Sequence, residues 1–164
     1  ITAAMALGAS QSDVNTFTNA MTWNGKDGIY SYLGFNIDRN SFIVDFEYTT
    51  YGVEDSVDAV KDTWFLGLGY RINDKTTVII HTEEWATSEN DADSFNDVSH
   101  PVLQATGKAL LEAFALREFD GSGLTLRYDF HPSATFKLDY FSGSDTRPNV
   151  GDYSFISAGI DLVF

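Results

Sequence analysis

The chain has 164 residues, no cysteine, and 24 acidic against 10 basic side chains, which gives a formal net charge of −14. Without cysteine, a disulfide framework and a thiolate metal site are excluded, and so little positive charge argues against nucleic acid as a partner. Hydrophobic residues make up 43% of the chain, which favours one folded domain over a disordered polymer. No stretch approaches the ~18 consecutive apolar residues of a membrane-spanning helix, a test that does not apply to membrane-spanning strands.

The N-terminal segment, residues 1–27, carries weak signals. Its first ten residues, ITAAMALGAS, are small and apolar, as in the end of a secretory signal or in a loop. Apolar residues within Thr16–Trp23, followed by the turn-like pair Asn24-Gly25, allow one additional strand here. We therefore treat residues 1–27 as an extra strand or a loop.

From about residue 28 apolar side chains occur at every second position, the pattern of a strand between an apolar and a polar medium. In the stretch 41–50, four apolar side chains at even positions alternate with residues that include Asp45 and Glu47. The same pattern predicts seven strands, at about 29–38, 41–50, 63–72, 75–85, 124–130, 134–140 and 153–164.

The connections between these strands alternate in length. Short turns are expected at 38–40, 73–74 and 131–133, whereas 51–62, 86–122 and 142–152 are long. Apolar residues recur at helical spacing in 102–117, inside the longest connection. Alternating short turns and long loops are typical of outer-membrane barrels. We therefore expect residues 28–164 to form an all-β, transmembrane, antiparallel up-and-down β-barrel of seven to eight strands, with a long loop at 86–122.

Charged side chains occupy the face opposite the apolar one on consecutive strands. In a barrel they would line a wet lumen, whereas in a soluble β-sandwich they would be solvated surface, and alternation alone does not separate the two. The predicted lumen residues carry an acidic excess of 6 − 3 = 3, which would weakly favour cations in a channel. They are Asp45, Glu47, Arg71, Glu83, Arg127, Asp129, Lys137, Asp139 and Asp161.

The C-terminal pattern of Ser157, Gly159, Leu162 and Phe164 resembles the assembly signal of bacterial outer-membrane β-barrels. The stretch LTLRYDFHPSATFKLDY, residues 124–140, resembles the penultimate hairpin of Gram-negative outer-membrane porins: an Arg-Tyr-Asp-Phe strand, a proline turn and a lysine-bearing return strand. Strand pairs within 33–48 and the strand at 66–71 are similar to those of the same proteins.

This resemblance covers about residues 28–164. Such porins are usually more than twice this long and form a sixteen-stranded trimeric pore, so the chain looks like the C-terminal half of one, or like a short relative. The resemblance implies the outer membrane of a Gram-negative bacterium as location. It implies the lipid bilayer, lipopolysaccharide and the barrel assembly machinery as partners, and a homotrimer as assembly. The family's N-terminal strands and constriction loop have no counterpart in this sequence.

Few residues suggest a metal site or catalysis. His81 and Glu83 share a strand face at i, i+2 spacing, which could supply two metal ligands or a hydrogen bond in the lumen. His100, close to Asp97 and Ser99, is the one candidate for a hydrolytic site. We expect neither a catalytic residue nor a cofactor.

These patterns predict three functions, in order of preference. The first is a porin-type channel for passive diffusion of small hydrophilic solutes, weakly cation-favouring. The second is a small eight-stranded outer-membrane barrel with a structural or adhesive surface role, whose acidic loops at 54–58 and 89–97 could also bind divalent cations. The third is a secreted β-sandwich that binds a ligand.

Overall fold

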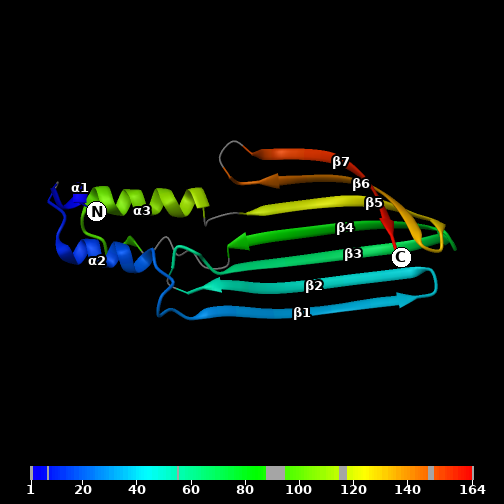
Figure 1. Cartoon of the computed structure of the whole chain (residues 1–164), viewed down its shortest axis with the longest axis horizontal. Helices are drawn as coiled ribbons and strands as arrows, with labels where there is room; N and C mark the ends of the chain where they lie inside the picture. The colour runs from blue at the N-terminus through cyan, green and yellow to red at the C-terminus, as the bar shows by residue number, and fades with distance from the viewer. Residues whose placement is uncertain are drawn as a thin grey trace. The chain divides into compact units, whose positions relative to one another are not determined.

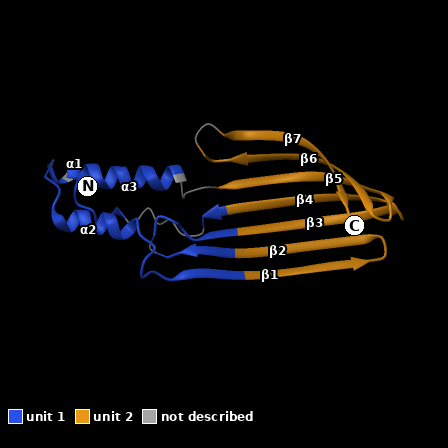
Figure 2. Ribbon diagram, viewed as in Figure 1, with its two compact units in different colours: residues 1–31, 50–62, 86–117 blue, residues 32–49, 63–85, 118–164 orange. Residues whose placement is uncertain are grey.

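The computed structural model describes residues 2–6, 8–54, 56–87, 95–114, 118–147 and 150–163. The chain divides into two compact units (Figure 2). Unit 1 comprises residues 1–31, 50–62 and 86–117, and unit 2 comprises residues 32–49, 63–85 and 118–164.

The strands form one antiparallel up-and-down sheet in which chain neighbours pair (Figure 1). Seven strands are present in the described residues, as the alternation predicts: β1 (Gly28–Arg39), β2 (Phe42–Val53), β3 (Lys61–Asn73), β4 (Thr76–Thr87), β5 (Phe119–His131), β6 (Ala134–Asp145) and β7 (Gly151–Leu162). The sheet order runs from β1 to β7 without pairing between these two in the part of the chain that is described. The sheet is therefore open, and these strands do not close a barrel among themselves.

The alternation of short and long connections is confirmed. The pairs Asn40-Ser41, Asp74-Lys75 and Pro132-Ser133 separate the strands at one end of the sheet, hereafter the turn end. Asn40 has a φ of 55°, in the left-handed region that asparagine tolerates better than most residues. The connections 54–60, 88–118 and 146–150 lie at the other end, hereafter the loop end.

Residues expected to add a strand at Thr16–Trp23 form a helix instead, so that prediction is wrong. α2 (Gln11–Ala20) begins with a capping box: the Asp13 backbone N–H donates to Ser10 Oγ at 3.0 Å, and the Ser10 backbone N–H donates to Asp13 Oδ2 at 3.2 Å. This cap satisfies two backbone donors that an extended chain would leave to water. An eight-stranded barrel therefore lacks the eighth strand that we assigned to this segment.

Unit 1 also contains α1 (Thr2–Ala6) and α3 (Pro101–Phe114), the latter in the segment where the sequence shows helical spacing. Phe95 and Leu111 are fully buried in the core of this unit, and Phe17 packs its ring 5.4 Å from that of Phe95. A Cβ at Gly107 would lie 2.2 Å from Phe95 Cδ1, so only glycine allows this approach. The core consists of Ala9, Val14, Ala20, Ala59, Phe95, Val98, Leu103 and Leu111.

Asp13 links the two longer helices of unit 1. Its carboxylate accepts hydrogen bonds from Ser10 Oγ at 2.6 Å, from Ser99 N at 2.7 Å and from His100 N at 3.2 Å. These bonds hold the pKa of Asp13 below its usual range, chiefly through the Ser10 hydroxyl. One carboxylate thus caps α2 and orders the residues that lead into α3.

Candidate functional site

One of the two faces of the sheet in unit 2 consists of apolar side chains, and we call it the apolar face. Strand register pairs Leu124 with Tyr140 and Leu126 with Leu138, and Phe136 faces Ile160 on the last strand. Its other side chains follow from strand alternation and from ring contacts. The set is Leu33, Phe35, Ile37, Phe42, Val44, Phe46, Tyr48, Leu66, Leu68, Tyr70, Ile72, Val78, Ile80, Leu124, Leu126, Tyr128, Phe136, Leu138, Tyr140, Ile156, Ala158 and Ile160.

Many of these side chains are not covered by other parts of the described chain. Leu68, Ile80 and Ile160 are 53%, 62% and 60% exposed, although each lies within a strand. A soluble monomer rarely exposes a contiguous apolar patch of more than a few hundred Å². The apolar face, which extends over all seven strands, therefore requires an apolar medium or an apolar partner.

Aromatic side chains border the apolar face near both ends of the strands. At the loop end, Trp64 donates its indole N–H to Glu84 Oε2 at 2.9 Å. At the turn end, the Phe42 and Tyr70 rings lie 5.3 Å apart in an edge-to-face contact. The stretch of β3 from Trp64 to Ile72 is nine residues long, close to the ~9–11 residues of a tilted membrane-crossing strand.

The opposite face, which we call the polar face, carries all nine residues that the sequence predicts for a lumen: Asp45, Glu47, Arg71, Glu83, Arg127, Asp129, Lys137, Asp139 and Asp161. Register places Arg127 opposite Lys137, Thr125 opposite Asp139 and Thr135 opposite Asp161. Because each belongs to the same alternating set along its strand, the nine share one side of the sheet.

The basic side chains of this face are neutralised by neighbouring carboxylates. Arg71 binds Asp38 through two nitrogens, at 2.7 and 2.5 Å. On β5, Arg127 Nε lies 3.0 Å from Asp129 Oδ1. Between β6 and β7, Lys137 Nζ lies 2.7 Å from Asp161 Oδ2. These three pairs lie toward the turn end.

Three acidic residues of the polar face have no hydrogen bond or ion pair within the described chain: Asp45, Glu47 and Glu83. They lie on β2 and β4, closer to the loop end than the paired bases. Asp139 differs, since it accepts from Thr125 Oγ1 at 2.6 Å and from Ser157 Oγ at 3.3 Å. The acidic excess of this face therefore lies mainly on β2 and β4, with Asp139 of β6 as a fourth carboxylate that no base neutralises among the described residues.

An aromatic cluster, which the sequence analysis did not identify, lies at the loop end of the polar face. It consists of Phe65, His81, Phe119, Phe141, Tyr153 and Phe155. Its ring centroids are 5.5 to 6.5 Å apart from one neighbour to the next, and the ring planes lie within 30° of parallel. The sequence holds a signal for this cluster. Its residues occupy the alternate positions that belong to the polar face, whereas most other aromatic residues of these strands occupy positions of the apolar face.

Glycines allow these rings to lie against the sheet. A Cβ at Gly121 would lie 2.1 Å from Phe141 Cζ, and one at Gly123 would lie 2.2 Å from His81 Nε2. Gly67 is covered in the same way by Phe65, at 3.1 Å. The rings therefore rest on bare backbone and overlap one another, which leaves the central Phe141 only 6% exposed.

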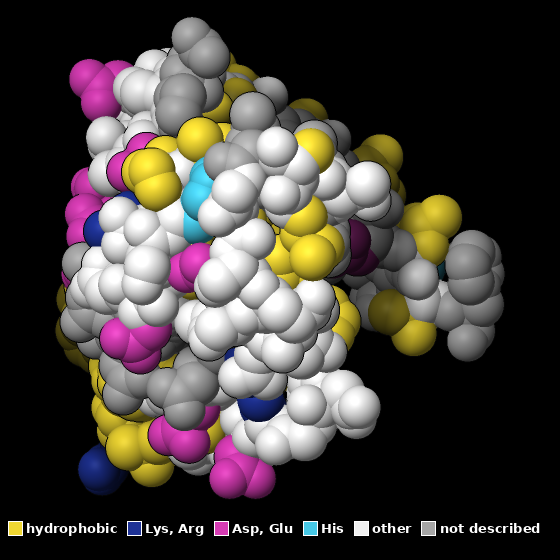
Figure 3. All heavy atoms as spheres, turned by 90° about the vertical axis from the view of Figure 1, so that its left-hand side faces the viewer, with side chains coloured by type: hydrophobic (Ala, Val, Ile, Leu, Met, Phe, Trp, Pro, Cys, Tyr) yellow, Lys and Arg dark blue, Asp and Glu magenta, His cyan; other side chains and the backbone are white. Residues whose placement is uncertain are grey.

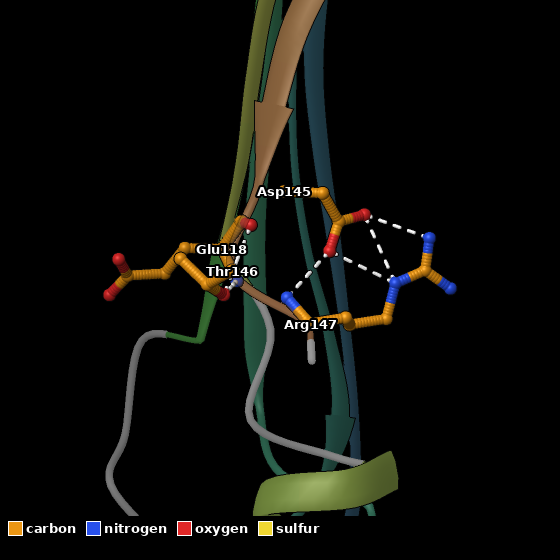
Figure 4. A network of polar contacts seen from close by, with 4 residues as sticks. All are labelled: Glu118, Asp145, Thr146 and Arg147. Atoms are coloured by element: carbon orange, nitrogen blue, oxygen red, sulfur yellow. Dashed lines mark hydrogen bonds and ion pairs between the residues drawn. The ribbon is translucent and has the colours of Figure 1, made fainter. Parts of the chain in front are cut away.

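The loop end of β5 and β6 is held by two sets of polar contacts (Figure 4). Thr146 N donates to Glu118 O at 3.0 Å, and Glu118 N donates to Thr146 Oγ1 at 2.9 Å. Arg147 donates to the buried Asp145 carboxylate, from NH2 at 2.8 Å and from Nε at 2.9 Å, which raises the pKa of Arg147. Figure 4 shows the Glu118 side chain pointing away from this ion pair.

The metal and catalytic candidates find little support in the described residues. His81 stacks between Phe65 and Phe141, at 5.7 and 5.9 Å, and its Nδ1 is buried without a hydrogen-bond partner. Ser99 and His100 offer their backbone N–H groups to Asp13. Within the described ranges no three His, Asp or Glu side chains gather as metal ligands would.

Three of the four residues of the predicted assembly signal belong to the edge strand of the sheet. Ser157, Gly159 and Leu162 belong to β7, whereas Phe164 lies outside the described residues. Of the acidic side chains in the two predicted acidic loops, Asp55, Glu89, Asp91 and Asp93 lie outside the described residues as well. Acidic side chains are spread over the face drawn in Figure 3, with few basic ones among them, as the net charge of −14 leads one to expect.

No helix among the described residues has the length and hydropathy to cross a membrane. Comparison of the chain with protein-family models, with curated proteins and with solved structures finds no match in any of the three.

Proposed function

We propose that the sheet is a segment of a porin-type β-barrel in the outer membrane of a Gram-negative bacterium. In this proposal the apolar face contacts lipid, and the polar face lines a water-filled channel for small hydrophilic solutes. The observation that carries it is the exposed, aromatic-bordered apolar face, set back to back with a face of paired charges. A soluble sandwich would cover the first face with a second sheet.

The proposed channel needs further strands, because an open sheet encloses no lumen. We propose that they pair along β1 and β7, whose outer edges have no strand neighbour in the described chain. Unpaired edges of this length promote association in water, and closure of a barrel removes them. The resemblance to porins implies that three such barrels associate.

The proposed mechanism is geometric and electrostatic. Solutes would diffuse passively, and the uncompensated carboxylates of Asp45, Glu47 and Glu83 would raise the local concentration of cations. The bases that would otherwise attract anions are already paired with Asp38, Asp129 and Asp161. The expected selectivity is therefore a modest preference for small cations.

Quenching of tryptophan fluorescence by brominated lipids tests the orientation of the sheet. Two single-tryptophan proteins retain either Trp64, on the apolar face, or Trp85, on the polar face, with phenylalanine at the other tryptophan positions. In vesicles of phosphatidylcholine brominated near the headgroup end of the chains, we expect strong quenching of Trp64 and weak quenching of Trp85. Equal quenching of both, or no vesicle association, would overturn the proposal.

Conductance tests the channel itself. Protein reconstituted in a planar bilayer with a KCl gradient should give a reversal potential of the sign for cation preference. The triple variant Asp45→Asn, Glu47→Gln and Glu83→Gln should move this potential toward zero, because it removes the unpaired charges. The matched variant Asp120→Asn, whose residue lies on the other face of β5, should leave it unchanged. Vesicle insertion without conductance would favour a structural or adhesive role.

A further inference from the structure

We infer that the loop-end half of the polar face is a binding site for organic ammonium ions that carry an aromatic ring. The site is the aromatic cluster together with the carboxylates of Asp45, Glu47 and Glu83. The inference deepens the proposed function by naming a solute class, and it rests on that proposal for the route by which the solute arrives.

The aromatic cluster supplies the contact surface. Side chains that face water on a strand are normally small or polar, yet six rings overlap here on a floor of glycine backbone. Phe155 remains 50% exposed at its edge, whereas Phe141 is buried at its centre. A planar ring that lies on this surface would cover exposed apolar area and extend the existing stack.

The carboxylates supply the charge and lie within reach of the rings. The Asp45 Cβ lies 3.7 Å from the position that a Gly67 Cβ would take, and the Phe65 ring covers the same glycine. Glu83 is two residues from His81 on one strand face and is paired in register with Gly121, under the Phe141 ring. An ammonium group seated at the Phe65–His81 side would therefore face ring surfaces and carboxylates together.

Charge complementarity favours a ring-bearing cation over an anion or a neutral ring as the ligand. At the loop end of the described strands, the two bases are already paired: Arg147 with Asp145, and Lys61, the first residue of β3, with Asp58. An anion would meet Asp45, Glu47 and Glu83 without a free cation to balance them. A neutral ring would gain the stacking but leave the three carboxylates without a partner. A cation that carries a ring uses both features.

The test uses benzyltrimethylammonium, benzyl alcohol and benzenesulfonate as cationic, neutral and anionic probes of similar ring size. Binding is measured by titration calorimetry on the full chain in non-ionic detergent, with empty micelles as the blank. We expect benzyltrimethylammonium to bind measurably more tightly than either other probe. Equal binding of benzyl alcohol would reduce the site to an unspecific apolar patch and overturn the inference.

Variants locate the site. The triple variant Asp45→Asn, Glu47→Gln and Glu83→Gln should weaken binding of the cation by roughly tenfold, as expected for the loss of three exposed charge contacts. Phe65→Leu should weaken it by about threefold through the loss of one cation–π contact at the side where the ammonium is seated. The control Asp120→Asn, at the same height of the sheet but on the apolar face, should bind as the parent does.

Two results would overturn the site: unchanged binding in either the triple variant or Phe65→Leu, or equal weakening in Asp120→Asn. Because the three carboxylates have no partner in the described chain, their amides should not disturb folding, and circular dichroism checks this. Failure of the inference and failure of the channel are distinguishable. Binding in detergent without conductance removes the proposed function alone, and conductance without binding removes the ammonium site alone.

Discussion

The two units of this chain bury their apolar side chains in opposite ways. In unit 1, Phe95 and Leu111 are fully enclosed by helices and loops, as in any protein that folds in water. In unit 2, equally large side chains such as Leu68 and Ile160 stay more than half exposed within well-paired strands. Unit 1 buries its apolar side chains within itself, whereas those of unit 2 are left exposed by the described chain. The difference is the main reason for proposing that only the sheet meets lipid.

The comparison also shows what each unit depends on for its specificity. Unit 1 depends on fit, since Gly107 leaves room for the Phe95 ring and nothing larger. In the proposed membrane setting, the apolar face of unit 2 depends only on the alternation of side chains, because a fluid hydrocarbon adapts to any apolar shape. Mutations should therefore act differently in the two units.

The largest effect is expected for truncation of the unit 1 core. Phe95→Ala should destabilise this unit by about 3–5 kcal/mol, because the surrounding side chains cannot fill the cavity. Hydrogen exchange of α2 and α3, followed by mass spectrometry, should report the loss. Leu138→Ala on the apolar face of the sheet is the matched variant, and in detergent it should cost far less. Comparable losses in both would contradict the comparison.

A charge on the apolar face comes next. Phe46→Arg should destabilise the protein in vesicles by about 2–4 kcal/mol, because the guanidinium would enter hydrocarbon near the middle of β2. Glu47→Arg, one residue later and on the polar face, should be much milder. Urea titrations of both variants in lipid vesicles measure the difference. If the two cost the same, the faces do not meet different media.

The Asp13 carboxylate gives unit 1 a pH dependence that can be tested by mutation. Because its pKa is held low in the folded chain, Asp13 stabilises unit 1 fully above its unfolded pKa of about 3.9. That contribution is lost as the pH falls from this value through the folded pKa. Thermal unfolding of α2 and α3 by circular dichroism, between pH 6 and pH 3, should show the loss.

Two variants sharpen this expectation. Asp13→Asn should lower the stability of unit 1 near neutral pH and flatten its dependence on acid. Ser10→Ala removes the bond from the Asp13 backbone N–H to the hydroxyl and the bond from the hydroxyl to the Asp13 carboxylate, and should cost about 1 kcal/mol. An unaltered acid transition in Asp13→Asn would show that another group controls it.

The smallest effect is expected for the ion pair of Lys137 and Asp161. Both side chains are largely in solvent, 42% and 60% exposed, so a double-mutant cycle with Lys137→Gln and Asp161→Asn should give a coupling below about 1 kcal/mol. A coupling of several kcal/mol would mean that this part of the polar face is shielded from water.

Strand alternation predicted the sheet well because a period of two is a local property of the sequence. Seven strands and the alternation of their connections could be predicted from residues such as Phe42, Val44 and Asp45. β5 was expected to begin at 124 but begins at Phe119. The residues Gly121 and Gly123 indicate a loop by composition, yet they are strand residues covered by rings from neighbouring strands.

The aromatic cluster and α2 were not predicted, although the sequence holds a signal for each. The cluster depends on the register between strands, which brings Phe141 beside Phe155. No single stretch of sequence contains this register. In α2 a local signal was present, the capping pair of Ser10 and Asp13, but the short apolar spacing after it was interpreted as a strand. Reading caps before periodicity would have assigned the helix.

An odd number of strands limits how this sheet can be closed. In an up-and-down sheet of seven strands, β1 and β7 run in the same direction. A neighbour that pairs antiparallel with both edges must therefore contribute an odd number of strands. Two copies of the seven-stranded sheet joined around a common axis along the strands would meet at parallel seams. Fourteen strands from two halves related in this way would thus require a mode of pairing that occurs nowhere within the described sheet.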